Sequence, residues 1–381
     1  MRFLFLNQLD KINDKYGPWL FYIGLFLLIV SRYWILTNKD TPNVYFTLYA
    51  MFHHTGRLLI LCRLLLFSHK YPLYVLFCIV IGVLLLYSYS LSEFRTLIYS
   101  FIIIAASKDA NIKSILKVFL LAFLLVLCMG VVFWNYGWTS DLVKHKFGLI
   151  GHSWGFMNPN FFAFFMLMAT LLVLQYWDIK QTKVIWITCW SVAFLSFMLT
   201  LGLTSVIILL LIPIFYYFLK HYSIDARYLA FLPWFLLLAS IILSCYYGSS
   251  YGETTFESRF SIPALVYQKN GLSLFGQEYG YVSFFASFVT GEHPLCVDNL
   301  YMHLVLCDGV IIALFVFIFL SHYLYKIGMC GHPLLISSAI GFTLSGIMEN
   351  QPIDALLNFM LLYYFHLFAP SYKSGQEVLD S

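Results

Sequence analysis

The sequence has very little charge. Only 10% of its 381 residues are Asp, Glu, Lys or Arg, and 61% are hydrophobic, whereas a soluble domain carries about 25% charged residues. The formal net charge of +4 comes with no basic tail or arm, so a nucleic-acid partner is not expected. The composition predicts a polytopic membrane protein.

Paired cysteines and paired metal-binding carboxylates are also missing. The eight cysteines are scattered singly, mostly inside apolar runs, with no Cys-x-x-Cys pair. No Asp-x-Asp triplet occurs either, so a divalent cation that holds a pyrophosphate is not expected. We therefore expect no disulfide framework, no metal site and no cofactor.

Apolar runs fill most of the chain. About twelve segments approach the ~20 residues needed to cross a bilayer, near 19–36, 44–67, 72–91, 94–107, 114–134, 160–175, 184–201, 204–220, 229–246, 300–320, 333–348 and 353–369. The uncharged run 184–219 would measure about 54 Å as one helix against a ~30 Å hydrocarbon core. It must fold back, and 202–205 is the predicted turn. We expect an all-α integral membrane domain over residues 1–381.

The distribution of basic residues predicts the orientation. With the N-terminus in the cytoplasm, the outer side collects only Lys39, Arg95, Lys144, Lys146, Arg259 and Lys269. The cytoplasmic ends and loops collect all the others except Arg32 and Arg57, which lie within spans. The positive-inside rule then places both termini in the cytoplasm. Two long loops, 135–159 and 247–299, face outward, and long loops on a rigid scaffold usually carry function.

The first external loop has tight glycine turns and polar side chains. His152 is a candidate hydrogen-bond donor, and Asn158-Pro159-Asn160 leads into a helix. Either Asn158 or Asn160 can cap that helix, because Pro159 suits a first turn. Either can also contact a sugar hydroxyl, and the two roles are compatible.

The second external loop contains Arg259, which lies between Phe256 and Phe260. One interpretation is a surface salt bridge with Glu253 or Glu257. The other is a guanidinium that binds a phosphate through two parallel hydrogen bonds.

Several short blocks of the two loops resemble one family. The blocks are Gly155 to Asn160, Arg259 with Pro263-Ala264-Leu265, Leu274-Phe275-Gly276, Asp298-Asn299-Leu300-Tyr301, and Asp308-Gly309. Together with the topology they are similar to the signature of Wzy-type polysaccharide polymerases and the related O-antigen ligases.

This resemblance implies a GT-C-like membrane glycosyltransferase. Its substrate would be an undecaprenyl-pyrophosphate-linked oligosaccharide, polymerised at the outer face of a bacterial plasma membrane. A flippase and a chain-length regulator would be its protein partners, beside membrane lipid. No metal is expected, so cations of the protein would stabilise the leaving pyrophosphate, with Arg259 as the candidate.

Two departures from the family bear on the activity. The ligases usually carry His before the Asn, where this chain has Asp298, and this favours a polymerase over a ligase. The hairpin turn that often carries an arginine is Thr204-Ser205-Val206 here. A transporter or flippase is the alternative of another class, although the sequence shows no internal repeat and no matching pair of broken helices.

Asp298 has two possible roles. It can cap the helix predicted from residue 300, or it can act as the general base that deprotonates the acceptor hydroxyl. His293 is a second candidate base. We expect Asn299 and Tyr301 to contact substrate, and Asp308, seven residues after Tyr301, to share its helix face and point into the bundle.

Polar residues in other spans complete the candidates. His53 and Arg57 are four residues apart, hence on one helix face, and Arg32 lies in the first span. Such groups usually line a cavity or site, but Arg32 and Arg57 can also snorkel or pair with acids for packing. Glu349 at an outer helix end can contact the glycan or only be solvated.

Overall fold

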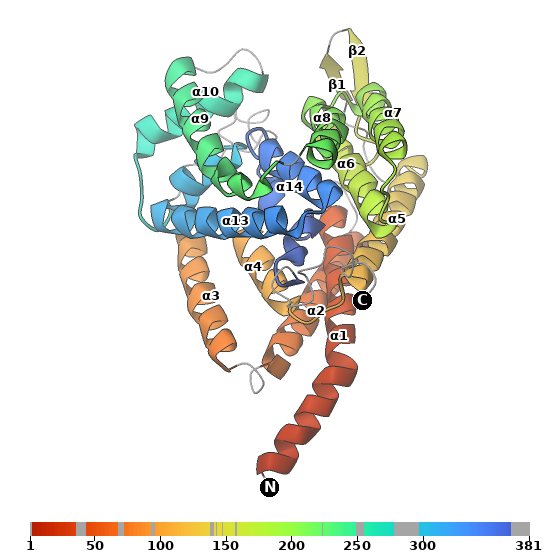
Figure 1. Cartoon of the computed structure of the whole chain (residues 1–381), viewed down its shortest axis with the longest axis vertical. Helices are drawn as coiled ribbons and strands as arrows, with labels where there is room; N and C mark the ends of the chain where they lie inside the picture. The colour runs from red at the N-terminus through yellow and green to blue at the C-terminus, as the bar shows by residue number, and fades with distance from the viewer. Residues whose placement is uncertain are drawn as a thin grey trace.

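The protein is a bundle of helices with a small β-hairpin at one end (Figure 1). The computed structural model describes residues 2–35, 43–67, 72–92, 96–137, 141, 143–146, 148–156, 158–222, 224–248, 255–277 and 297–366.

The helices and strands follow one another in chain order as α1 (Arg2–Ile35), α2 (Asn43–Phe67), α3 (Pro72–Ser92), α4 (Thr96–Ala106), α5 (Ile112–Asn135), β1 (Val143–Lys146), β2 (Leu149–His152), α6 (Pro159–Tyr176), α7 (Thr182–Thr200), α8 (Leu203–His221), η1 (Ala226–Phe231), α9 (Leu232–Tyr247), α10 (Thr255–Asn270), α12 (Leu300–His303), the π-helical turn η2 (Leu304–Asp308), α13 (Val310–Cys330), α14 (Pro333–Ser345), η3 (Gln351–Ile353) and η4 (Phe359–Tyr363).

Apolar helices confirm a membrane-embedded, mainly helical protein. Among the described residues, six helices are long and apolar enough to cross a membrane, namely α5, α6, α7, α8, the helix over Ala226–Tyr247 and α13. Shorter apolar helices lie in α3, α4 and α14. The predicted total of twelve spans stays a prediction. The antiparallel hairpin, which pairs Val143 with His152, was not expected in an all-α chain.

Close backbone contact joins α1 to α2. A Cβ added to Gly56 would lie 2.8 Å from Leu28 and 3.0 Å from the carbonyl oxygen of Gly24. Small residues at a helix crossing allow this approach in a membrane. The crossing brings the polar residues of the two helices, Arg32 on α1 and His53 and Arg57 on α2, to one region.

The predicted reversal of the 184–219 run is confirmed. The helix α7 ends at Thr200, and α8 begins at Leu203. Leu201 adopts the left-handed conformation with φ 55°, and Gly202 leaves no room for a side chain, because a Cβ there would lie 2.4 Å from that of Ala163.

The tenth predicted span, 300–320, is a broken helix. One turn of α12 passes into the π-helical turn η2, and α13 begins only after Gly309. The expectation that Tyr301 and Asp308 share one face of a continuous helix is therefore wrong. Asp308 is nevertheless buried, with 1% of its surface exposed.

The twelfth predicted span is wrong as a helix, because residues 351–363 form two 3-10 turns joined by irregular backbone. The local polar side chains explain this course. Asp354 Oδ1 accepts from Leu356 N at 3.0 Å, Asn358 Oδ1 accepts from Met360 N at 3.1 Å, and Asn358 Nδ2 donates to Pro352 O at 2.7 Å. Irregular backbone is tolerated at membrane depth only when protein surrounds it, and 352–363 is buried throughout.

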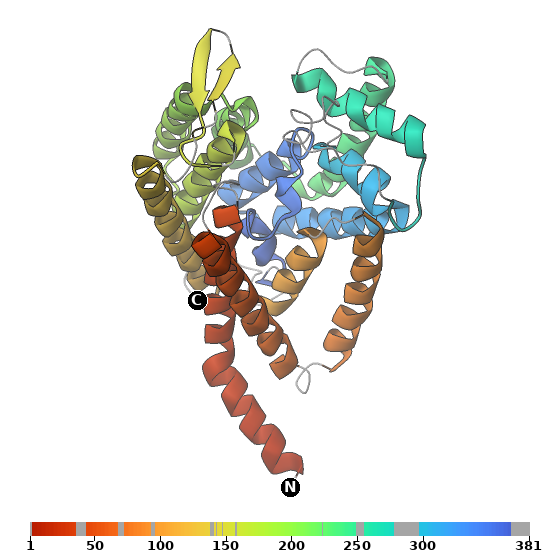
Figure 2. The ribbon, with the colours of Figure 1, turned by 180° about the vertical axis from the view of Figure 1, so that it is seen from behind.

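The β-hairpin and α10 lie at the same end of the molecule, and the N-terminal half of α1 projects from the opposite end (Figures 1 and 2). The helix α13 runs across the direction of α1 in both views. The two predicted external loops therefore contribute to one end, as far as their described residues show.

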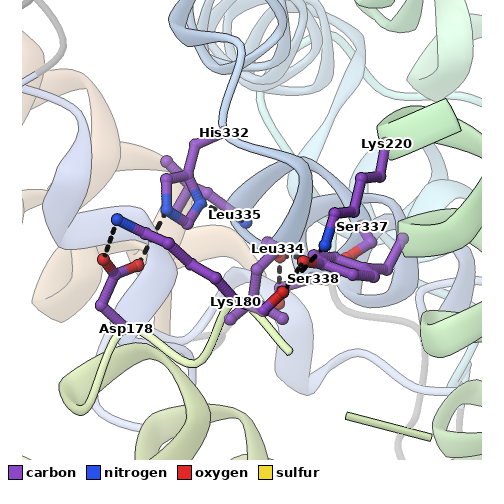
Figure 3. A network of polar contacts seen from close by, with 9 residues as sticks. Asp178, Lys180, Lys220, His332, Leu334, Leu335, Ser337 and Ser338 are labelled. Atoms are coloured by element: carbon purple, nitrogen blue, oxygen red, sulfur yellow. Dashed lines mark hydrogen bonds and ion pairs between the residues drawn. The ribbon is translucent and has the colours of Figure 1, made fainter. Parts of the chain in front are cut away.

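A polar network fastens the connection between α6 and α7 to the start of α14 (Figure 3). Asp178 accepts from Lys180 Nζ at 2.7 Å and contacts His332 Nε2 at 3.1 Å. The other ring nitrogen of His332 accepts from Leu335 N and so caps α14. Lys220 donates to the carbonyl oxygen of Lys180 at 2.9 Å. These contacts give Lys180 and Lys220 a structural role.

Candidate functional site

Three charged residues from distant parts of the chain meet beside α10. Arg259 on α10 forms an ion pair with Asp298, which precedes α12, and its second terminal nitrogen lies 3.9 Å from Glu349 Oε1. The side chains of Arg259 and Glu349 are 12% and 11% exposed, and that of Asp298 is 29% exposed. One guanidinium thus lies between two carboxylates in a partly buried setting, with Asp298 the most open of the three.

Asn299, and not Asp298, caps the following helix. Its Oδ1 accepts from Met302 N at 3.1 Å, and its Nδ2 donates to Ser240 Oγ at 3.0 Å. The carboxylate of Asp298 is therefore not needed for the cap. Asn299 itself is fully buried, and both ends of its side chain are used within the fold.

Tyr301 has a packing role in this structure. Its ring is fully buried and stacks on Phe317 with ring centroids 6.2 Å apart. Its hydroxyl donates to the carbonyl oxygen of Thr343. Gly346 leaves space for the ring, since a Cβ there would lie 3.1 Å from it. These contacts attach α12 to the end of α14, and so place Asp298 near Glu349.

Two of the short blocks noted in the sequence, Leu274-Phe275-Gly276 and Asp308-Gly309, meet in a backbone contact that is called the latch below. The start of α13 receives its missing acceptors from the loop after α10, because Val310 N donates to Ser273 O at 2.9 Å and Ile311 N to Leu274 O at 3.0 Å. A Cβ on Gly309, whose φ is +97°, would lie 2.3 Å from the nitrogen of Gly276. Close backbone contact therefore explains the glycines at positions 276 and 309.

The π-helical turn encloses a buried acid and a histidine. His303 Nε2 lies 3.8 Å from Asp308 Oδ2, and both side chains are at most 4% exposed. His303 Nδ1 lies 3.0 Å from Val297 O, and Ser88 of α3 donates to the carbonyl oxygen of Asp308 at 2.9 Å. Isolated π-helical turns occur frequently at functional sites, and this one follows α12, the helix that begins two residues after Asp298.

The polar residues of α1 and α2 form a second group. Arg32 Nε donates to Asp354 Oδ2 at 3.0 Å. Arg32 therefore pairs with an acid, as the packing interpretation of this arginine predicts. His53 Nδ1 lies 3.2 Å from Ser31 Oγ. Arg57 lies over the Tyr99 ring at 4.4 Å from its centroid. A cavity of about 110 Å³ borders His53, Arg57 and Tyr99.

The open end of the hairpin, where β1 begins and β2 ends, holds an aspartate–histidine pair. Asp141 contacts Nδ1 of His152, and it accepts from Ser153 N at 2.8 Å and Trp154 N at 3.1 Å. Burial alone would raise the pKa of Asp141, but the hydrogen bonds from His152 and the two backbone groups together lower it below its usual value. His152 is thereby oriented, with 41% of its side chain exposed.

The two asparagines of the first loop have separate tasks. Asn158 caps α6, where its Oδ1 accepts from Phe161 N at 2.8 Å. Asn160 accepts from Lys144 Nζ at 3.1 Å and so ties β1 to α6. Gly151 allows β2 to approach the end of α7, because a Cβ there would lie 2.5 Å from Thr200 O. The hairpin is thus fixed to the bundle.

The structure brings together Arg259, Asp298 and Glu349, and separately Arg32, His53 and Arg57. His293 and Glu253 lie outside the described residues. Two acids with structural partners, Asp354 and Asp141, were not predicted from the sequence. Asp354 could have been, because an acid inside an apolar run usually has a partner. Asp141 could not have been, because its separation of eleven residues from His152 matches no helix or strand period.

Comparisons of the chain with protein-family models, with curated proteins and with solved structures gave no match.

Proposed function

We propose that the protein is a membrane-embedded polymerase that joins polyprenyl-pyrophosphate-linked oligosaccharides at the end of the molecule that carries the hairpin and α10. The observation that carries this proposal is the contact of Arg259 with Asp298 and Glu349, three residues from separate segments. It supplies a cation for a leaving pyrophosphate and a carboxylate for an acceptor hydroxyl in one place.

The proposed reaction is a glycosyl transfer. The acceptor hydroxyl oxygen forms a bond to the anomeric carbon of the donor, and the bond from that carbon to the pyrophosphate oxygen breaks. The bonding pair leaves with the lipid pyrophosphate, whose negative charge Arg259 stabilises. The hydroxyl proton passes to Asp298 as general base.

The ion pair itself links donor binding to base activity. While Arg259 holds Asp298, the carboxylate oxygen in the ion pair is not available to an acceptor hydroxyl. A guanidinium has five N–H donors and matches phosphate oxygens with two of them at once. A bound pyrophosphate competes with Asp298 for Arg259, and this competition releases the carboxylate to the acceptor hydroxyl when the donor is present.

The test uses purified protein and one defined lipid-linked repeat unit, which serves as donor and acceptor. A polymerase gives a ladder of products on a gel, with lipid pyrophosphate released in equal amount to the bonds formed. Arg259→Ala should abolish the ladder. Arg227→Ala is the matched control, because Arg227 forms an exposed ion pair with Asp225 next to η1.

The alternatives give different results in the same assay. A ligase leaves the repeat unit unextended unless a separate acceptor is supplied, and a flippase leaves it chemically unchanged. An unextended repeat with well-folded wild-type protein would contradict the proposal.

A further inference from the structure

A second cavity lies beneath α13, away from the candidate site. It has a volume of about 370 Å³ and lies between α3, α4, α13 and the irregular C-terminal segment. This is within the ~300–1,000 Å³ range of small-molecule sites. Its walls are mostly apolar and aromatic, and include Phe77, Phe101, Phe315 and Phe319.

One end of this cavity is polar. The hydroxyl of Tyr74 donates to Ala105 O at 2.6 Å, and Lys108 Nζ lies 4.3 Å from the centre of the Tyr74 ring. His322 Nδ1 and the hydroxyl of Tyr364 lie 3.2 Å apart. Lys326 follows His322 by four residues on α13, so it lies on the same helix face.

This polar end faces away from the candidate site. Tyr74 is at the beginning of α3, and in Figure 1 that end of α3 points away from the β-hairpin and α10. A lipid whose head group meets Lys108 and Lys326 therefore belongs to the opposite leaflet from the one that would hold the sugar donor. The donor's carrier lipid is thus a poor fit to the cavity.

The chemistry of the cavity indicates a charged lipid. Lipid tails are as apolar as leucine, so an acyl chain alone has no preference for an apolar wall over the bilayer. Selectivity must come from the head group, and basic pockets between transmembrane helices bind anionic head groups. We propose that this cavity binds an anionic phospholipid, with an acyl chain between α3, α4 and α13 and its phosphate at Lys108, His322 and Lys326.

The test measures lipid retention by native mass spectrometry. The purified protein is exchanged into neutral detergent with phosphatidylglycerol or phosphatidylcholine, and bound lipid is counted. We expect one phosphatidylglycerol to be retained in preference to phosphatidylcholine. Lys108→Gln and Lys326→Gln should each weaken phosphatidylglycerol binding about fivefold. Cys78→Trp should abolish this binding, because Cys78 lines the cavity and the indole would occupy it.

Controls separate this site from general lipid contact. Lys117→Gln should have no effect, because Lys117 is exposed on α5 and does not border the cavity. Equal retention of the two phospholipids, or unchanged binding in the Lys108→Gln/Lys326→Gln double variant, would overturn the proposal. Displacement of phosphatidylglycerol by an equimolar polyprenyl phosphate, independent of both lysines, would assign the cavity to the carrier lipid and would also overturn it.

Discussion

Arg259 has two carboxylate partners, and the geometry of its side chain decides how it can serve. Its planar guanidinium can contact Asp298 with one edge and lie near Glu349 with another, whereas the ammonium group of lysine is a single compact charge. A substitution that keeps the charge therefore tests the geometry.

We expect Arg259→Lys to lower the polymerisation rate about 10²–10³-fold, because lysine cannot reproduce the two parallel hydrogen bonds to a phosphate. The measurement is the initial rate of product formation from one lipid-linked repeat. Arg227→Lys is the control for a general effect of the exchange. A rate within twofold of the wild type in Arg259→Lys would show that only the charge is required.

Asp298→Asn separates base function from structure, because Asn299 alone caps α12. Asparagine cannot take up a proton at neutral pH. We therefore expect the rate to fall by roughly 10²-fold or more, with the protein still folded. The same assay reports the outcome, and fluorescence-detected gel filtration checks the fold. An active Asp298→Asn variant with an inactive His293→Ala variant would assign the base to the histidine.

Asp141 is expected to hold the open end of the hairpin in place. Because its pKa is lowered in the folded protein, its contribution is complete above the ordinary carboxyl pKa of ~4 and is lost as the pH falls through the lowered value. At neutral pH, Asp141→Ala should cost about 1–2 kcal/mol of local stability. Hydrogen exchange at the Ser153 and Trp154 amides should then be about tenfold faster. Unchanged protection of these amides would show that the hairpin is held by other contacts.

Among the elements, the latch between the loop after α10 and the start of α13 depends on Gly309. A side chain there meets the backbone of Gly276, and the φ of +97° is unfavourable for any residue but glycine. We expect Gly309→Ala to destabilise the protein by about 2–4 kcal/mol, measured as a lower midpoint of thermal unfolding.

Gly331→Ala is the matched comparison for this latch. Gly331 also has a positive φ, of +66°, but no atom lies within 4 Å of the position of a Cβ. Its cost should stay near 1 kcal/mol. Equal losses in the two variants would mean that backbone strain, and not the contact with Gly276, is responsible.

The regular elements were predictable because apolar run length and turn residues determine them. The reversal at Gly202 followed from the length of an uncharged run. The break at Gly309 and the irregular backbone after Gln351 could not be predicted from the sequence, because both depend on partners far away in the chain. Ser273 and Leu274 supply acceptors to α13, and Ser100 of α4 accepts from Ala355 N at 2.9 Å.

The candidate site was predictable in its members but not in its contacts. In the sequence, Arg259 stood out as a loop cation between two phenylalanines and Asp298 as an acid before an apolar run, and both belong to the blocks that resemble the polymerase family. Glu349 stood out at the outer end of a predicted span. Glu253 or Glu257 was the predicted ion-pair partner of Arg259, because local acids are the simplest choice. The contacts with Asp298 and Glu349 depend on how α10, α12 and α14 pack, and no local pattern reports that packing.

For the molecule as a whole, the hairpin and α10 at one end predict a shared exposure to one aqueous side. Cysteines introduced at Ile150 and Tyr267, whose side chains are 51% and 53% exposed, should both react with a membrane-impermeant thiol reagent in intact cells. A cysteine at Tyr16, which is 50% exposed on α1, should react only after permeabilisation. The unsubstituted protein gives the background, and labelling of Ile150→Cys without Tyr267→Cys would contradict the arrangement.

The irregular segment 351–363 has a consequence for how the protein is made. A continuous helix can pass from the insertion machinery into the bilayer without a partner, because its backbone hydrogen bonds are all made within the helix. This segment cannot, since Ala355 N needs Ser100 and Asp354 needs Arg32. Residues 351–363 therefore need α1 and α4 in place before they can take up this course. We therefore expect residues 351–363 to enter the fold by docking onto α1 and α4, and not by the lateral release of one more helix.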